Sequence, residues 1–339
     1  MRRKFLLPLA LLLLLTGCAA GEAASETARY APEDADRLVI YTSHKEEIYW
    51  PIIQEFEQRT GIWVEVVTGG TNELLERIEQ EKGAPAADVM FGGGVESLES
   101  YQDCFTPYTS SQAPYIQERF RDGDGLWTPF SALPVVLIYN TKLVKPEQLT
   151  GWSDLLSPTF RGRIAFADPG VSGSCYTGLV TLMYAVEGED TLYRFAESLG
   201  GSQLDDSGDV LTSVAGGTDL VGITLEGSAL QRMAAGDDIA LAYPADGTSC
   251  VPDGSALVKG APHEDNAKLF LDFTVSRDVQ ELLSAQFYRR PVRSDVEPGL
   301  DLTGLSDLLL IDYDVDWASD QRQAILMTWA FFLGGEESP

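Results

Sequence analysis

The sequence predicts an α/β fold built on mostly parallel sheets, because strand-like and helix-like segments alternate along the chain. Residues 37–43, RLVIYTS, form an apolar, β-branched run that is typical of a buried parallel strand. Residues 46–61 repeat apolar side chains at helical spacing and end at Gly61, a common helix terminator. A strand over 62–69, a helix over 72–83 and a strand over 87–93 extend the series to β-α-β-α-β.

The second half of the chain predicts another α/β unit. Residues 126–140 are extended and carry prolines, which indicates a crossing strand. A helix pattern follows the turn at 168–178, and further helix and strand patterns alternate from there to a helical tail. The later helices are expected over 190–201, 227–236, 265–276 and 312–332, and the later strands over 220–226 and 239–244. About 300 residues are enough for two lobes.

The first 17 residues predict a lipoprotein signal peptide. Three cations precede FLLPLALLLLL, an apolar run that is too short to span a bilayer. Leu15-Thr16-Gly17-Cys18 then resembles a bacterial lipobox, although an ordinary signal peptide with an incidental cysteine is the alternative. We expect Cys18 to be lipidated and to anchor the chain to the outer face of the cytoplasmic membrane, with residues 18–36 as a flexible tether.

The charge of the chain excludes some classes of partner. The formal net charge is −28, and loss of the three n-region cations would bring it to about −31. Such a surface argues against nucleic acid and against general binding to anionic lipid. Cys104, Cys175 and Cys250 match no zinc spacing, so buried thiols are the simpler interpretation and one disulfide stays open.

No catalytic motif is present in the sequence. Ser/His/Asp spacing, a P-loop and HExxH are all missing. His44 and His263 are the only histidines. We therefore expect neither enzyme activity nor a cofactor.

Turns rich in Gly, Ser and Thr follow the predicted strands. Ligands of parallel sheets bind beyond the carboxyl ends of the strands, and such turns would aim backbone N–H groups and helix dipoles at an anion. The alternative is that their hydroxyls only cap helices or close turns. The candidates after the first three strands are Thr42, Ser43, His44, Gly70, Thr71 and Gly93, and the turn DPGVSGSCYTG adds Ser172, Gly173, Ser174 and Thr177.

A series of motifs along residues 37–295 resembles the substrate-binding lipoproteins of bacterial ABC importers, in the branch related to ferric-iron-binding and sugar-phosphate- or phosphonate-binding proteins. Matching pieces include YTSHKEE, ADVMFGG, LIYN, PDG-ALVKGA and RRPVR. The resemblance implies a two-lobed periplasmic-binding-protein-like fold, whose lobes are joined by two crossing strands and close around the ligand. We expect lobe 1 in residues 37–133 plus 245–285, and lobe 2 in 134–244 plus 286–339.

The resemblance also bears on the ligand. Ferric-binding members use a His after the first strand, an acid after the third and a Tyr pair after a later strand. His44 matches, but Gly92-Gly93-Gly94 offers no acid and residues 223–227 offer no Tyr pair. In those relatives the turn that matches Ser172–Ser174 holds a small anion. We therefore expect a phosphorylated or phosphonate organic anion, with ferric iron on His44 and Glu226 (or Glu96) as the alternative.

The remaining candidates have roles that follow from their chemistry. His44 would donate to a phosphoryl oxygen or a hydroxyl of the ligand. An ordinary His titrates at about pH 6.5, so the ligand could induce the charge of His44. Glu226 would accept from hydroxyls or an ammonium group, and Arg290 would pair with phosphate. The alternatives are a capping histidine, a solvated acid and a surface ion pair. Weaker candidates are Asp168, Asp206, Trp127, Tyr243, Tyr288 and Arg293.

The sequence thus predicts an extracytoplasmic solute-binding lipoprotein of an ABC transporter. It would capture a small anionic solute, a sugar phosphate, phosphoglycerate or phosphonate, between its lobes and deliver it to the permease subunits. We expect a monomer that is held at the membrane through Cys18 and has no nucleic-acid partner.

Overall fold

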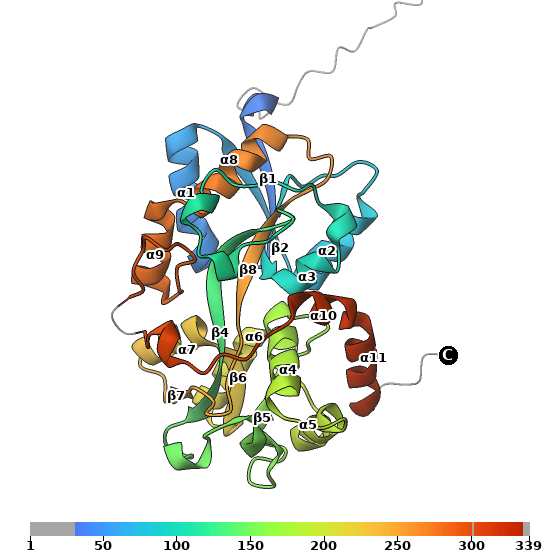
Figure 1. Cartoon of the computed structure of the whole chain (residues 1–339), viewed down its shortest axis with the longest axis vertical. Helices are drawn as coiled ribbons and strands as arrows, with labels where there is room; N and C mark the ends of the chain where they lie inside the picture. Colours follow the sequence, from blue (N-terminus) through green and yellow to red (C-terminus); the bar gives the residue numbers. More distant parts are fainter. Residues whose placement is uncertain (1–30, 300–301, 335–339) are drawn as a thin grey trace, which may run out of the picture. The chain divides into compact units, whose positions relative to one another are not determined.

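The computed structural model describes residues 31–299 and 302–334. The predicted signal peptide, Cys18 and most of the predicted tether lie outside the described residues. From Ala35 onward the chain forms one compact unit (Figure 1). In the described ranges, no helix is both long enough and apolar enough to cross a membrane.

The strands follow one path in the order β2-β1-β3-β8-β4-β6-β5, with β7 paired to β4. Their bounds are β1 Arg37–Thr42, β2 Trp63–Thr68, β3 Val89–Gly94, β4 Thr128–Asn140, β5 Ile164–Ala165, β6 Val221–Leu225, β7 Ile239–Ala242 and β8 Cys250–Leu257. β1 pairs in parallel with β2 and β3, and β5 pairs in parallel with β6. β8 runs antiparallel to β3 and β4, and β4 runs antiparallel to β6 and β7.

The sheet is therefore mixed, which corrects the expectation of mostly parallel sheets. The physical reason lies in β4 and β8. The chain leaves its first half along β4 and returns to it along β8, so the two strands run in opposite directions where they pair. The parallel strand pairs that βαβ units predict are found only at the two ends of the path, in β2-β1-β3 and in β6-β5.

Helices cover the strands in both halves of the path. Their bounds are α1 Glu46–Thr60, α2 Thr71–Gln80, α3 Val95–Glu99, α4 Gly173–Ala185, α5 Thr191–Leu199, α6 Ser207–Gly216, α7 Glu226–Ala234, α8 Glu264–Thr274, α9 Arg277–Phe287, α10 Val315–Asp320 and α11 Arg322–Phe332. α1 buries Ile48, Ile52 and Phe56 at helical spacing. It ends at Gly61, whose φ of 75° is left-handed, as expected for a helix terminator.

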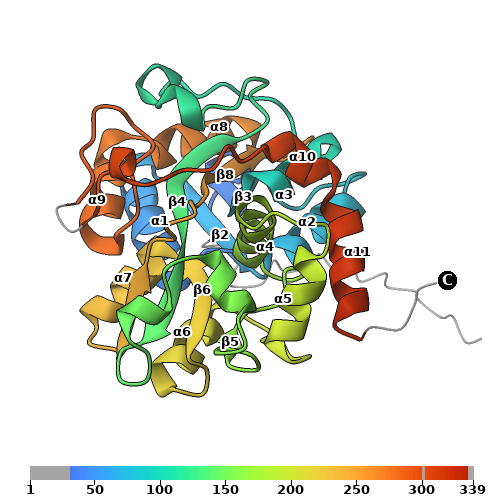
Figure 2. The same cartoon turned by 60° about the horizontal axis from the view of Figure 1, so that its bottom comes forward.

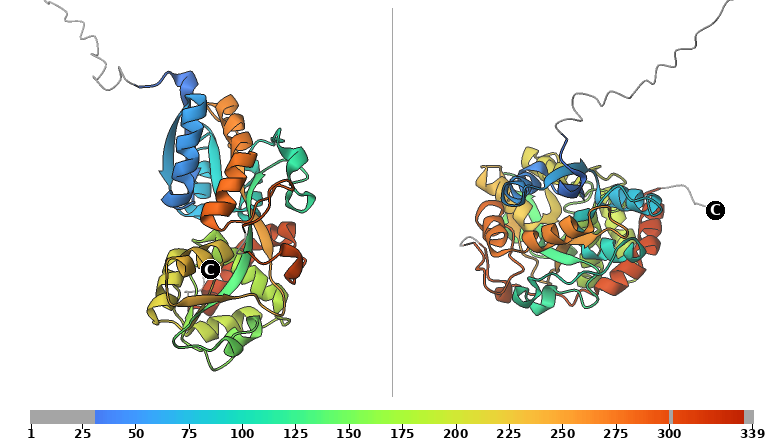
Figure 3. Two further views of the ribbon diagram at one scale, coloured as in Figure 1. Left: turned by 90° about the vertical axis from the view of Figure 1, so that its left-hand side faces the viewer. Right: turned by 90° about the horizontal axis from the view of Figure 1, so that it is seen from above.

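β4 passes from one hydrophobic core to another. Phe130, near its start, packs in a core with residues of β1, α1 and α8. Val135 and Tyr139, later in the same strand, pack in a different core with residues of α4 and α5. The left view of Figure 3 shows these two groups of elements with the green strand running between them. This is the expected two-lobed α/β fold with β4 and β8 as the crossing strands.

The C-terminal helices contact both groups of elements. α10 packs on α3, and α11 packs on α5 (Figure 2). The boundaries of the lobes therefore remain predictions, above all the assignment of residues 286–339. In the part of the chain that the structure describes, Cys104, Cys175 and Cys250 are free thiols.

Candidate functional site

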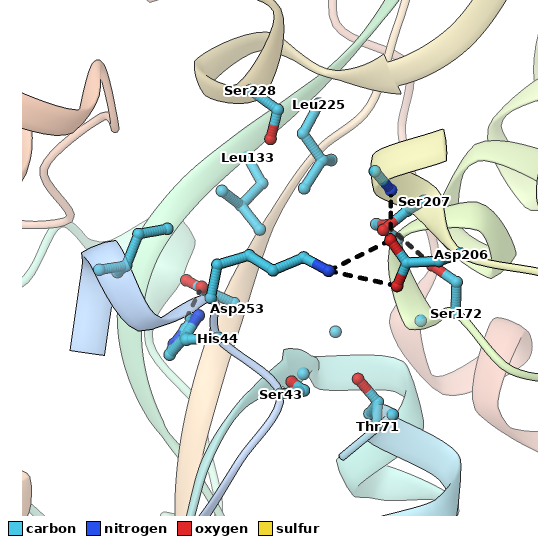
Figure 4. A pocket seen from close by; sticks show the side chains of 18 of the residues that line it. Ser43, His44, Thr71, Leu133, Ser172, Asp206, Ser207, Leu225, Ser228 and Asp253 are labelled. Atoms are coloured by element: carbon cyan, nitrogen blue, oxygen red, sulfur yellow. Dashed lines mark hydrogen bonds and ion pairs between the residues drawn. The ribbon is translucent and has the colours of Figure 1, made fainter. Parts of the chain in front are cut away.

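A pocket of about 600 Å³ lies where loops from both groups of elements meet (Figure 4). Its wall is formed by the ends of β1, β2 and β3, by the crossing strands and by the starts of five helices, α1, α2, α4, α6 and α7. Pockets of this size suit small organic ligands. Because the start of a helix carries free N–H groups and partial positive charge, the helix starts on this wall favour negatively charged groups of a ligand locally.

All but two of the predicted site residues line this pocket. Those on its wall are Thr42, Ser43, His44, Gly70, Thr71, Gly93, Ser172, Gly173, Ser174 and Thr177. Glu226 and Arg290 are not on the wall. Arg290 Nε lies 2.7 Å from Glu226 Oε2 and Arg290 Nη2 lies 2.8 Å from Glu226 Oε1, and both residues are buried. Their charges compensate each other, which corrects the expectation that they face the solute.

The starts of α2 and α4 meet at the pocket. Ser172 caps α4 by accepting from the N–H of Cys175 at 3.4 Å, and its Oγ lies 3.1 Å from Ser174 Oγ. A Cβ added to Gly173 would lie 3.3 Å from Thr71 Oγ1, in the first turn of α2. Capping and anion binding use the same N–H groups, so the two interpretations of this turn are compatible. We call residues Gly70, Thr71 and Ser172 to Ser174 the anion cradle.

Gly93 is a glycine for a steric reason. Its φ is 114°, and an added Cβ would lie only 2.8 Å from Thr71 Cγ2. A side chain at this position would therefore strain the backbone and push against the cradle.

His44 lies on the pocket wall, and its ring packs against aromatic side chains. Its ring centroid is 4.6 Å from that of Phe91 and 5.0 Å from that of Phe130. Nε2 lies 3.7 Å from Asp253 Oδ2 and has no hydrogen-bond partner in the described structure. Burial, and then the charge of Arg289, hold the pKa of His44 well below its ordinary value. The structure thus favours a neutral ring when no solute is bound, and a charge on His44 that is induced by the ligand stays a prediction.

Asp253 and Arg289 line the pocket and were not predicted. Arg289 Nη1 lies 2.6 Å from Asp253 Oδ2, and the backbone N–H and the hydroxyl of Ser131 donate to Asp253 Oδ1 at 2.7 and 2.8 Å. Burial raises the pKa of Asp253, while Arg289 and Ser131 oppose the rise. Arg289 and Arg290 are neighbours in YRRPVR, and no local sequence pattern indicates which of them reaches the pocket.

Most of the weaker candidates make hydrogen bonds or ion pairs with other residues of the protein and do not line the pocket. Trp127 donates to Glu99 at 2.8 Å, Tyr243 donates to Glu226, and Asp168 accepts from the N–H of Gly170 at 2.7 Å. Arg293 pairs with Asp295 at 2.8 Å. Asp206 alone among the weaker candidates lies on the pocket wall.

Glu96 is fully buried behind the cradle. Thr177 on α4 donates to its Oε1, and Tyr313 donates to the same oxygen at 3.4 Å. Oε2 has no hydrogen-bond partner in the described structure, and a Cβ added to Gly94 on the pocket wall would lie 2.8 Å from it. Burial raises the pKa of Glu96, although the Thr177 hydrogen bond and the charge of Arg322 oppose the rise.

We expect Glu96→Gln to remove a pH dependence of stability. The pKa of Glu96 is higher in the folded than in the unfolded chain, so the folded state holds its proton to higher pH. The free energy of unfolding should therefore fall as the pH rises above the ordinary Glu range, and this component should be missing in the variant. Urea unfolding from about pH 4 to about pH 8 measures it, with the exposed Glu76→Gln as the control. Equal slopes for wild type and Glu96→Gln would contradict the account.

The side chains suggested for iron do not meet at the pocket. Across residues 31–299 and 302–334, no group of three or more His, Cys, Asp or Glu side chains is placed to hold a metal ion. His44 lies at the pocket, but Glu226 is paired with Arg290 away from it.

Comparison with known proteins identifies the family. The family model described as bacterial extracellular solute-binding protein matches residues 85–316, more than half of the chain. The chain belongs to this family. The resemblance seen in the sequence motifs is thereby confirmed. Because such proteins bind solutes without transforming them, this solute-binding protein is not an enzyme.

Similar proteins differ in the solutes that their names give. Iron uptake protein A1 of Synechocystis is 26% identical over 301 residues, 84% of this chain and 82% of that protein. The putative 2-aminoethylphosphonate-binding periplasmic protein of Salmonella typhimurium is 26% identical over 286 residues, 79% of this chain and 82% of that protein. The periplasmic binding protein AfuA of Actinobacillus pleuropneumoniae, solved with exogenous fructose-6-phosphate bound, has a TM-score of 0.82 and 26% identity, over 88% of this chain and 98% of that chain. The similar proteins therefore do not decide which solute this solute-binding protein binds, and the residues of its own pocket are the evidence for it.

Proposed function

We propose that this solute-binding protein serves an ABC transporter by capturing a small phosphorylated or phosphonate organic anion. The anionic group would bind at the anion cradle, and closure of the two lobes would present the loaded protein to the permease subunits. On this proposal the chain works outside the cytoplasmic membrane, to whose outer face it is anchored by a lipid on Cys18.

The meeting of two helix starts at the cradle is the observation that carries the proposal. α2 and α4 begin at the same place on the pocket wall, with Thr71 and Gly173 in close approach. A phosphoryl group has several acceptor oxygens, and N–H groups at the starts of two helices can donate to them from different sides. Ser172 and Ser174 add hydroxyl donors at the same point.

The rest of the pocket suits the organic part of such a solute. Thr224 and Ser228 on the pocket wall would supply polar contacts, and Leu133 and Leu225 would supply apolar ones. Figure 4 shows Ser228, Leu133 and Leu225 close to one another. Ligand pockets commonly combine apolar lining with a few polar groups that orient the ligand. One similar protein is named for 2-aminoethylphosphonate and another was solved with fructose-6-phosphate bound, which supports this chemistry, whereas a third is named for iron uptake.

Thermal unfolding with a panel of solutes tests the proposal. We expect fructose-6-phosphate, a phosphoglycerate or 2-aminoethylphosphonate to raise the melting temperature, because a ligand that binds only the native state stabilises it by about 2.7 kcal/mol at a hundred times its Kd. Fructose and ethanolamine, which lack the anionic group, are the controls. A melting temperature that rises with ferric citrate and with no other solute of the panel would contradict the proposal and favour iron as the solute.

A further inference from the structure

Lys45 reaches across the pocket to Asp206. Lys45 is the N-cap of α1 and follows the loop after β1, whereas Asp206 is the N-cap of α6. Lys45 Nζ lies 3.1 Å from Oδ1 and 3.2 Å from Oδ2 of Asp206 (Figure 4). The two side chains are 56% and 55% exposed, so the pair is accessible to solvent and to a solute.

The ion-pair partner of Lys45 is of a different kind from the partners of the other cations on the described pocket wall. Arg289 is paired with the buried Asp253, and Arg232 with Asp237 in the turn after α7. These partners are buried or local, whereas the partner of Lys45 comes from the opposite side of the pocket. Lys45 is therefore the cation that can most easily change its partner.

The pocket wall carries more negative than positive charge. Against the three cations Lys45, Arg232 and Arg289 stand five carboxylates, those of Glu46, Glu47, Asp205, Asp206 and Asp253. The field of the wall as a whole thus opposes an anion. An anionic solute needs a cation in direct contact in addition to the N–H groups of the cradle.

Asp206 keeps a partner if Lys45 leaves it. Its Oδ1 accepts from the N–H of Gly208 at 2.6 Å, and a carboxylate at the start of α6 is stabilised by the helix dipole. Asp206 also lies on the pocket wall that includes the cradle residues Ser172, Gly173 and Ser174. Figure 4 shows Asp206 and Ser172 on the same side of the pocket.

We propose that Lys45 binds the anionic group of the solute and that Asp206 holds Lys45 until the solute replaces it. This inference rests on the proposed function. Exposed ion pairs contribute little to stability, so the Lys45–Asp206 pair is readily exchanged. An ammonium group makes charge-assisted hydrogen bonds to a phosphoryl oxygen as it does to a carboxylate. A phosphoryl group carries up to about two negative charges, so it attracts the Lys45 ammonium group more strongly than the single charge of Asp206 does. Asp206 therefore competes with the solute for Lys45, and the two residues have opposite effects on affinity.

Two single variants test these opposite effects by calorimetric titration of the purified protein with inorganic phosphate, fructose-6-phosphate and 2-aminoethylphosphonate. Lys45→Met should lower the affinity for the probe that binds by at least about tenfold. Asp206→Asn should raise it about two- to fivefold, because asparagine still caps α6 while the competing charge is gone. The double variant, Lys45→Met with Asp206→Asn, should bind the probe as weakly as Lys45→Met alone.

Matched variants separate the proposal from general effects. Lys142→Met removes the same charge from an exposed pair with Asp238 that is not on the pocket wall, and it should leave the affinity unchanged. Lys45→Arg keeps the charge and should retain affinity within about threefold. Circular dichroism establishes that each variant is folded.

The possible outcomes distinguish this proposal from the proposed function. If wild type binds a probe and Lys45→Met binds it equally well, or Asp206→Asn binds it more weakly, the role of Lys45 is overturned and the proposed function stands. If wild type binds none of the three probes and no phosphorylated or phosphonate solute of the thermal panel, the proposed function is refuted, and the role of Lys45 falls with it.

Discussion

Replacing Arg290 with methionine is expected to lower the free energy of unfolding by about 3 to 5 kcal/mol. The Glu226 carboxylate, whose side chain is 1% exposed, would lose both hydrogen bonds of the ion pair. The change would also remove the bond from Arg290 to the Thr303 carbonyl at 2.6 Å. Among the side chains that the structure describes, Tyr243 alone would remain as a donor to Glu226, which leaves a buried charge without a counter-charge.

Urea unfolding measures this loss, and an exposed pair supplies the control. Arg277→Met breaks the surface pair with Glu281, whose side chains are 60% and 52% exposed, and should cost less than about 1 kcal/mol. The double change Glu226→Gln with Arg290→Met should recover part of the stability lost by Arg290→Met. A loss at Arg290 no larger than that at Arg277 would contradict a structural role for the buried pair.

The same variant distinguishes the two interpretations of Arg290. If Arg290 stabilises the fold from outside the pocket, Arg290→Met protein that is still folded at low temperature should bind solute with wild-type affinity. The role expected from the sequence, bidentate pairing with phosphate, requires a loss of affinity instead.

Removing both cradle hydroxyls, by Ser172→Ala with Ser174→Ala, is expected to weaken binding of a phosphorylated solute about a hundredfold. Each hydrogen bond to a charged group contributes about 1.5 to 3 kcal/mol, and 1.4 kcal/mol corresponds to about tenfold in affinity. The two hydroxyls lie 3.1 Å apart at the start of α4, so both can reach one anionic group. Calorimetric titration with the solute found in the thermal panel measures the change.

The cap at Ser172 requires its own control. Loss of this N-cap costs about 1 kcal/mol of stability by itself. Asp314→Ala removes the N-cap of α10, where Asp314 accepts from the N–H of Trp317 at 2.9 Å, and α10 is not on the pocket wall. It should lower stability comparably and leave the affinity unchanged. Wild-type affinity in the double serine variant would show that the anion does not bind at the cradle.

Local sequence patterns were sufficient to predict which loops form the site. Strand patterns that end in Thr42-Ser43-His44 and in Gly93 located the ends of β1 and β3, and the turn at 168–178 located the start of α4. Since loops at the carboxyl ends of neighbouring strands meet, these segments could be assigned to one pocket without knowing the tertiary structure.

The remaining parts of the site depend on long-range contacts. α6 was not predicted, because SGDVLTSVAG contains two glycines and few strong helix formers; burial of Val210, Leu211 and Val214 stabilises it. Without α6, the approach of Asp206 to Lys45 was not foreseeable. The choice between Arg289 and Arg290 likewise depends on Asp253 and Glu226, which reach them from distant points of the chain.

Native mass spectrometry of freshly purified protein tests the central claim most directly, because it reads out the retained solute without a choice of candidates. We expect an added mass that corresponds to a small organic phosphate or phosphonate and that is released on denaturation as a phosphorus-containing anion. Ser172→Ala with Ser174→Ala protein should retain less of it. An added mass of ferric iron, or of an organic solute without phosphorus, would contradict the account.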